Sequence, residues 1–255
     1  IRQLMHQAHQ QGADLIHFPE GAMSGYVKAQ IRSWDGVDWD TLRAELQQTA
    51  ALAVELGIWA VIGANHRLTP PHRPHNSLYI CSPCGQQDTR YDKRWCSHSE
   101  LTDWYTPGRD PCVIEVGGWR FGCALCIEIQ FPEVFMDYAN AGVDAILFSA
   151  YADNPVFGIQ AQGYAASHNV WFSLSAPQQV SHALSSRVIG PDGLIQATCK
   201  PSQTPALCFA TLDEGDPRWK VPLQYAKPWR QKARGGEIYR ARWVDDPRST
   251  NKTQI

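Results

Sequence analysis

The sequence predicts an α/β fold with mixed sheets, formed as a single domain with an extension after it. The chain has 255 residues, 44% of them hydrophobic, which is long enough to bury a core without disulfides or a structural metal. Strand-sized apolar runs alternate with amphipathic helical patterns. Two-residue hairpin signals such as Gly117-Gly118 interrupt this alternation, which favours antiparallel strands beside parallel ones.

The helical patterns have recognisable ends. Gly12 and Gly57 stand where two helices should stop, and Pro132 stands near the first position of a third. We expect helices at residues 2–11, 38–56, 131–140 and 157–167. Apolar or β-branched runs bounded by turn residues predict the strands. We expect these at residues 13–18, 58–64, 78–81, 89–92, 112–116, 119–125, 145–150, 170–175, 185–189, 195–199 and 206–212.

Composition excludes several classes of protein. No run approaches the roughly 18 apolar residues of a membrane span. The 23 Lys and Arg nearly balance the 25 Asp and Glu, which argues against a nucleic-acid scaffold. The chain also shows no signal-peptide pattern at its start, so we expect a cytoplasmic location.

Charge is uneven along the chain. Residues 226–255 carry eight of the Lys and Arg but three of the Asp and Glu, with aromatic residues between them. We therefore divide the chain into a main domain at residues 1–222 and a basic extension at residues 223–255. We expect the extension to dock on the same chain or on a neighbouring subunit.

Eight cysteines could indicate a metal site, a disulfide framework or a nucleophile. Two Cys-x-x-Cys pairs begin at Cys81 and Cys123, but the interval between them is longer than the roughly 15 to 20 residues of a compact zinc ribbon. We predict no metal and no cofactor. No His-Glu-x-x-His or Gly-x-Ser-x-Gly segment is present, so the metalloprotease and serine-hydrolase motifs are missing.

Three reactive side chains follow predicted strands directly: Glu20, Lys93 and Cys126. Open α/β sheets place their ligand crevices at the carboxyl ends of strands, so these three could meet there. Each alone is weak evidence, because such residues are more often a solvated carboxylate, a surface charge and a packed thiol. The segments around them are FPEGAMSGY at 18–26, YDK at 91–93 and GCALCIEIQFPE at 122–133.

In this order and spacing the segments resemble the three signature motifs of the carbon–nitrogen hydrolase (nitrilase) superfamily, in its amidase-like branch. The resemblance implies an α-β-β-α sandwich with a catalytic triad of Glu20, Lys93 and Cys126. It also implies a second glutamate between the Lys and Cys motifs, for which Glu100 is the best match and Asp103 the competitor. That residue would orient Lys93 or a water.

The implied chemistry is hydrolysis of a non-peptide amide or N-carbamoyl bond through a cysteine thioester. Glu20 would act as the general base for the Cys126 thiol. Lys93 and the backbone N–H of Ile127 would stabilise the charge on the substrate oxygen. By the same resemblance, Tyr26, Trp104, Ile127, Ala150 and Tyr151 would contact the substrate.

Two alternatives stay open: hydrolysis of a nitrile, and a catalytically silent homologue that serves as a binding or assembly subunit. Nitrilases carry Trp directly after the nucleophile, whereas this chain has Ile127. The resemblance further implies a homodimer or higher homo-oligomer, and no nucleic-acid or membrane partner. It implies, too, a first strand ahead of the helix at 2–11. Since that strand is missing from this sequence, we expect either a late start or a partner that covers the sheet position.

Overall fold

The computed structural model describes residues 1–27, 29–86 and 88–253, and the chain separates into two compact units. The first unit is Ile1–Leu212 and the second is Asp213–Ile255. The first unit therefore ends earlier in the chain than residue 222, where the sequence suggests the division. The division at 222 stays a prediction.

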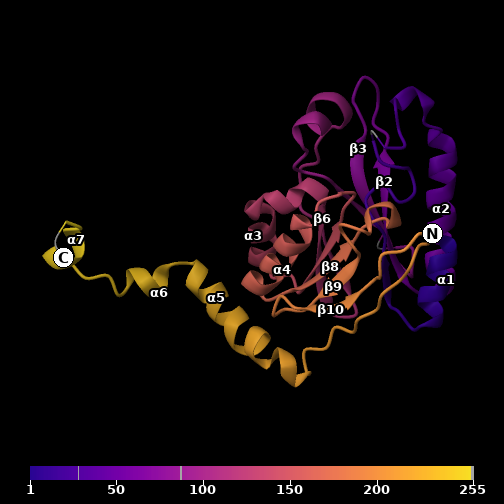
Figure 1. The fold of residues 1–255 in the computed structure, drawn as a ribbon. Helices are drawn as coiled ribbons and strands as arrows, with labels where there is room; N and C mark the ends of the chain where they lie inside the picture. The colour runs from indigo at the N-terminus through magenta and orange to yellow at the C-terminus, as the bar shows by residue number, and fades with distance from the viewer. Residues whose placement is uncertain (28, 87, 254–255) are drawn as a thin grey trace. The chain divides into compact units, whose positions relative to one another are not determined.

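Two mixed sheets form the centre of the first unit, with helices on their outer faces (Figure 1). In the described residues one sheet has four strands in the order β1-β2-β3-β4, and the other has six in the order β10-β9-β8-β7-β6-β5. The first sheet contains β1 (Leu15–His17), β2 (Trp59–His66), β3 (His75–Cys81) and β4 (Thr89–Asp92). The second contains β5 (Val113–Val116), β6 (Trp119–Leu125), β7 (Ala145–Ser149), β8 (Trp171–Ser175), β9 (Arg187–Ile189) and β10 (Ile195–Thr198).

Parallel and antiparallel pairing occur in both sheets, as the sequence predicts. Strands β1 and β2 are parallel, and so are β6, β7 and β8. The hairpins β2-β3, β3-β4 and β5-β6 are antiparallel. As a result, the carboxyl ends of β1 and β4 in one sheet and of β6 in the other can supply side chains to one site.

The helices pack on the two outer faces. Helices α1 (Arg2–Gln10) and α2 (Trp39–Leu56) share a core with β1 and β2, whereas α3 (Pro132–Asn140) and α4 (Val156–His168) share one with β6, β7 and β8. Helix α2 begins where the Asp38 carboxylate accepts a hydrogen bond from the Thr41 N–H, at 2.9 Å, and ends at Gly57 with φ of 66°. This helix–sheet–sheet–helix layering confirms the predicted sandwich.

A buried polar bridge joins the inner faces of the two sheets. The ring of His17 on β1 lies 2.8 Å from the Ser149 hydroxyl and 3.0 Å from the Ser173 hydroxyl, both on the six-stranded sheet. Ser149 also donates to the carbonyl of Phe18, at 2.8 Å. These contacts fix the end of β1 against the end of β7, two residues before Glu20.

One predicted strand is wrong. Residues 206–212 alternate in a way that favours a strand, but the structure assigns none there. A strand needs a neighbour to complete its hydrogen-bond ladder, and in the described residues neither sheet includes this segment.

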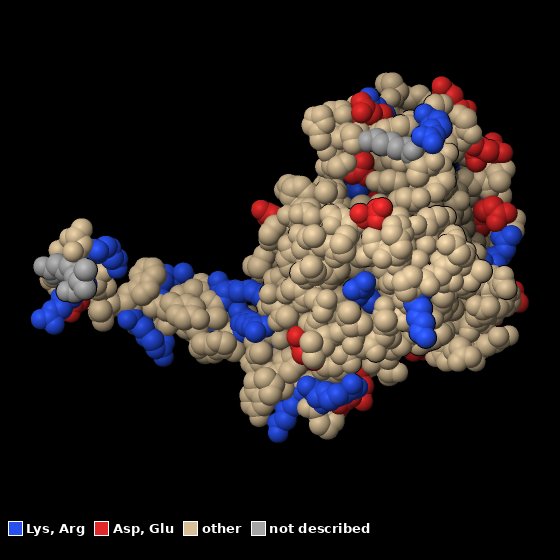
Figure 2. All heavy atoms as spheres, in the orientation of Figure 1, with Lys and Arg blue, Asp and Glu red and all other residues tan. Residues whose placement is uncertain are grey.

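The second unit contains α5 (Lys227–Arg234), α6 (Glu237–Arg240) and α7 (Pro247–Thr250). Lys and Arg are the prevalent charged side chains on its visible face (Figure 2). Several of its aromatic residues, including Trp229 and Trp243, are more than half exposed. Across the described chain, every helix is too short or too polar to span a bilayer.

Candidate active site

Glu20 occupies a tight turn directly after β1. The turn lies against β2 at Gly63, where a Cβ atom would come within 2.1 Å of the Pro19 carbonyl oxygen and 2.9 Å of the Glu20 Cα. Only glycine permits this approach. The close packing holds the Glu20 side chain in the interior, where it is 1% exposed.

Lys93 lies one residue beyond β4 and is also fully enclosed. Its backbone N–H donates to the Asn76 carbonyl on β3, at 2.8 Å, and its carbonyl accepts from the Gly108 N–H, at 2.8 Å. Burying an ammonium is costly unless anionic groups surround it. Two carboxylates meet this need.

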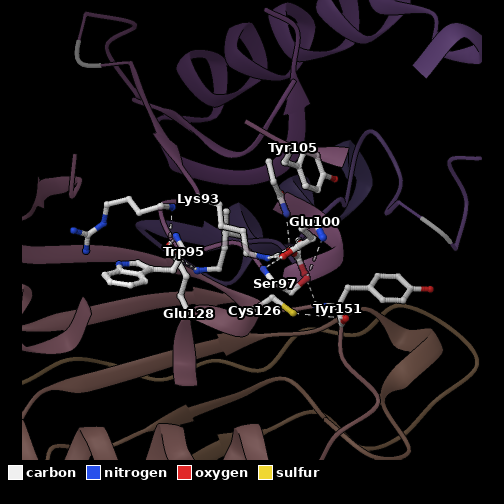
Figure 3. A network of polar contacts seen from close by, with 12 residues as sticks. Lys93, Trp95, Ser97, Glu100, Tyr105, Cys126, Glu128 and Tyr151 are labelled. Atoms are coloured by element: carbon white, nitrogen blue, oxygen red, sulfur yellow. Dashed lines mark hydrogen bonds and ion pairs between the residues drawn. The ribbon is translucent and has the colours of Figure 1, made fainter. Parts of the chain in front are cut away.

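Those carboxylates are Glu20 and Glu100. The Nζ of Lys93 lies 3.2 Å from Oε1 of Glu20, and 2.7 and 3.0 Å from the two carboxylate oxygens of Glu100. Glu100 begins a short helical turn, Glu100–Trp104, and also accepts from the Ser97 N–H at 2.8 Å (Figure 3). Asp103, the competing sequence match, lies on the exposed side of this turn.

Two further donors orient Glu20. The Asn76 amide donates to Oε1 at 2.7 Å, and the Tyr151 backbone N–H donates to Oε2 at 2.9 Å. Both carboxylate oxygens are thereby fixed, and the same Tyr151 backbone accepts a hydrogen bond from the Cys126 thiol. Asn76 was not among the predicted site residues. The signal for it is a polar Asn-Ser pair at the start of β3, directly before the apolar residues of the strand.

Cys126 is the first residue after β6 and has a φ of 49°. Positive φ is uncommon for residues other than glycine and is often found where function constrains the backbone. The turn directs the sulfur toward the Tyr151 carbonyl, 3.8 Å away (Figure 3). Cys126 is 7% exposed.

The buried charges determine the protonation of these groups. Burial raises the pKa of Cys126 well above 9.0, and the Glu20 charge adds to the rise, so the resting group is a thiol. Burial also raises the pKa of Glu20 above 4.5, although Lys93 opposes the rise. For Lys93, burial disfavours the charge, but Glu20 and Glu100 outweigh it and hold the pKa well above 10.5. The site can therefore hold a thiol beside a carboxylate of increased basicity and a fixed cation.

Glu128 anchors the turn that carries Cys126. Its carboxylate is fully buried and accepts from the backbone N–H groups of Leu125, Arg94 and Trp95 at 2.7, 2.8 and 3.0 Å. The Tyr91 hydroxyl donates to both of its oxygens at 2.8 Å. One carboxylate thus connects the end of β6 to the loop after Lys93. Glu128 belongs to the segment around Cys126 that the sequence analysis singled out, but its anchoring role could not be predicted because most of its hydrogen-bond donors lie elsewhere in the chain.

The five residues expected to contact substrate differ in what they touch. Tyr26 and Tyr151 stack with ring centroids 4.7 Å apart, and the Gln30 amide donates to the Tyr151 hydroxyl at 3.1 Å. Ala150 and Ile127 flank the site, one fully and one partly buried. Trp104 packs edge-on against Trp34, with centroids 5.6 Å apart, in an apolar cluster that also includes Tyr26. The roles of all five in binding stay predictions.

In the part of the chain that the structure describes, no three His, Cys, Asp or Glu side chains are grouped to hold a metal ion. The polar groups of the site are instead satisfied by one another. The arrangement is suited to acid–base and nucleophilic chemistry carried out by side chains.

Comparison with known proteins places the chain in a family. The model of the carbon–nitrogen hydrolase family matches residues 1–218, and the chain belongs to this family. A curated relative, described as a hydrolase in the pqqF 5′ region of Pseudomonas protegens, is 26% identical over 230 residues, covering 83% of this chain and 76% of its own. Deaminated glutathione amidase of Mus musculus is 25% identical over 195 residues, covering 66% and 58%.

Solved structures share the fold. The NitN amidase from Neterenkonia sp. AN1 superimposes with a TM-score of 0.71 at 21% identity, covering 94% of this chain and 90% of that one. Another structure of this amidase, a mutant, shows Michael addition of acrylamide at its active-site cysteine, with a TM-score of 0.71 at 20% identity over 94% and 90% of the two chains. At this level of sequence identity, the structural likeness shows that the fold is shared and nothing more.

Proposed function

We propose that this protein hydrolyses the carbon–nitrogen bond of a small amide or N-carbamoyl compound through a thioester on Cys126. The observation that carries the proposal is the enclosed cluster in which Lys93 contacts both Glu20 and Glu100, while Glu20 and Cys126 both bond the backbone of Tyr151. Family membership and the amidase relatives support the same class of reaction.

In the proposed first half-reaction, Glu20 accepts the Cys126 proton as the sulfur forms a bond to the substrate carbonyl carbon. Negative charge then develops on the carbonyl oxygen. Lys93 and the backbone N–H of Ile127 stabilise this charge. One such donor typically lowers the activation free energy by about 3 to 4 kcal/mol. Glu20 returns its proton to the departing nitrogen, so ammonia or an amine leaves and a thioester remains.

In the second half-reaction water replaces the nitrogen. Glu20 takes a proton from the water, the hydroxide oxygen bonds to the thioester carbon, and the carboxylic acid leaves as the thiol is restored. Glu100 does not react in this scheme. It holds Lys93 in place and balances its charge. The stacked Tyr26 and Tyr151 rings would form one wall of the acyl pocket.

The test is an ammonia-release screen of primary amides, N-carbamoyl amino acids and nitriles with the wild-type protein and a Cys126→Ala variant. We expect release from at least one amide or carbamoyl compound, and loss of release in the variant with its fold retained by circular dichroism. Full activity in the variant, or conversion of nitriles alone, would refute the proposal.

A further inference from the structure

Two cysteines that the proposed mechanism does not use, Cys199 and Cys208, lie close together around the carbonyl oxygen of Ser186. Cys199 follows β10 directly, and Cys208 lies in the returning segment of the same loop. Both bond the same carbonyl: the Cys199 N–H lies 2.9 Å and the Cys208 sulfur 3.9 Å from the oxygen of Ser186. The Cys199 thiol also donates to the Ala206 carbonyl at 3.5 Å, two residues before Cys208.

The pair is accessible to small reagents. Both cysteines are partly exposed, and both line a cavity of about 1110 Å³ in the first unit. The neighbouring Cys208 thiol lowers the pKa of Cys199, whereas Cys199 raises the pKa of Cys208, so Cys199 is the readier nucleophile of the two. Thiolate character and access are the two properties that favour attack on a disulfide.

Other cysteines differ from this pair in burial or in their neighbours. Cys112 has Cys123 as its neighbour, but Cys123 is completely buried within β6. Burial raises the pKa of Cys81 to about 12. Cys84 is exposed, but its thiol lies beside the Ser82 hydroxyl, at 3.5 Å. The loop after β10 thus brings two partly exposed thiols together around one carbonyl oxygen.

We propose that Cys199 and Cys208 form a reversible dithiol–disulfide site that responds to low-molecular-weight disulfides. The Cys199 thiolate attacks one sulfur of the small disulfide, forms a mixed disulfide and releases one thiolate. The Cys208 thiol then loses its proton, and the resulting thiolate attacks the Cys199 sulfur and releases the second small thiolate. The protein loses two electrons and two protons, and the small disulfide is reduced to two thiols.

A disulfide between Cys199 and Cys208 would constrain residues 206–212, the segment in which the sequence predicts a strand and the structure has none. Residues 206–212 belong to neither sheet in the described structure. A covalent bond from Cys208 to the end of β10 would hold this segment in place and restrict its unfolding. Glu20 and Tyr151 line the same cavity as these two thiols, but neither thiol takes part in the proposed hydrolysis.

The experiment exposes the folded wild-type protein to oxidised glutathione, alkylates the remaining thiols and maps them by mass spectrometry after trypsin digestion. Both cysteines remain in one peptide, residues 188–218, because Pro201 follows Lys200 and protects that bond from trypsin. We expect this peptide to become unalkylated and two hydrogen atoms lighter, about tenfold faster than Cys81 is modified. Dithiothreitol should restore two alkylatable thiols.

Variants separate the two steps. Cys208→Ser should trap the glutathione adduct on Cys199, whereas Cys84→Ser, the matched control, should leave the internal link unchanged. The proposal is overturned if the wild-type peptide stays fully alkylated, if it retains glutathione without closing, or if it closes only in denaturant. Because the peptide mapping uses the wild-type protein, it remains a valid test of the disulfide even if a variant does not fold.

Discussion

At the residue scale, Glu100 and Asp103 are near neighbours of the same charge that differ in what they touch. The Glu100 carboxylate lies 2.7 Å from the Lys93 ammonium and is buried, whereas Asp103 faces solvent. The sequence ranked Glu100 first but could not separate the pair, since a helical turn of three residues brings either side chain near the same loop. Side-chain direction, which depends on the turn, decides between them.

Replacing Glu100 by Gln should lower kcat by about 100-fold while KM changes far less. The variant retains the shape of the side chain but leaves Lys93 with Glu20 as its one anionic partner, which displaces the cation from the oxygen it is proposed to stabilise. Steady-state ammonia release measures the effect. Asp103→Asn is the control and should retain wild-type kinetics; equal losses in both variants would exclude the assigned role of Glu100.

At the element scale, the sequence predicted most of the sheets and helices because local patterns determine them. Apolar runs matched β2, β6, β7 and β8 within about two residues, and the glycine stops matched the helix ends. It also put Glu20, Lys93 and Cys126 at strand ends. It could not supply the contacts that cross between strands distant in sequence, such as Asn76 with Glu20, because nothing local encodes them. The strand predicted at residues 206–212 was wrong for the same reason, because the local pattern does not show whether a neighbouring strand is present.

Gly63→Ala should test how β2 positions the Glu20 turn. The added Cβ would lie 2.1 Å from a backbone oxygen and 2.7 Å from the Gly21 nitrogen, so the turn must shift. We expect a loss of about 1 to 3 kcal/mol in the free energy of unfolding by urea titration, together with a large loss of activity.

The matched control is Gly163→Ala in α4, where nothing lies within 4 Å of the added atom. Helix propensity predicts that this variant is equal to or more stable than wild type by up to about 1 kcal/mol. If Gly63→Ala were as stable and active as Gly163→Ala, the close packing of β2 on the Glu20 turn would not matter.

At the scale of the whole molecule, the two sheets are held together across their inner faces by His17. Burial lowers the pKa of this ring to about 3, so the folded protein keeps it neutral over most of the acidic range. The unfolded chain protonates it near the ordinary value of 6.5. As pH falls from about 6.5 to about 3, the unfolded state binds the extra proton and stability is lost.

This linkage predicts that His17 alone accounts for a loss on the order of 4 kcal/mol across that window. Urea unfolding at a series of pH values should show a shallower decline for His17→Asn than for wild type, even though the variant starts from a lower stability. His6→Asn, at an exposed position, should follow the wild-type slope. Identical slopes for all three proteins would mean that His17 does not govern acid unfolding.

The most direct test of the proposed function is to trap the thioester. The protein is mixed with an amide that releases ammonia, quenched in acid during turnover, and analysed by intact-protein and peptide mass spectrometry. We predict one acyl group on Cys126, present in a Cys123→Ala control and absent in Cys126→Ala. Continued ammonia release with no acyl adduct, or with the adduct on another cysteine, would contradict the mechanism.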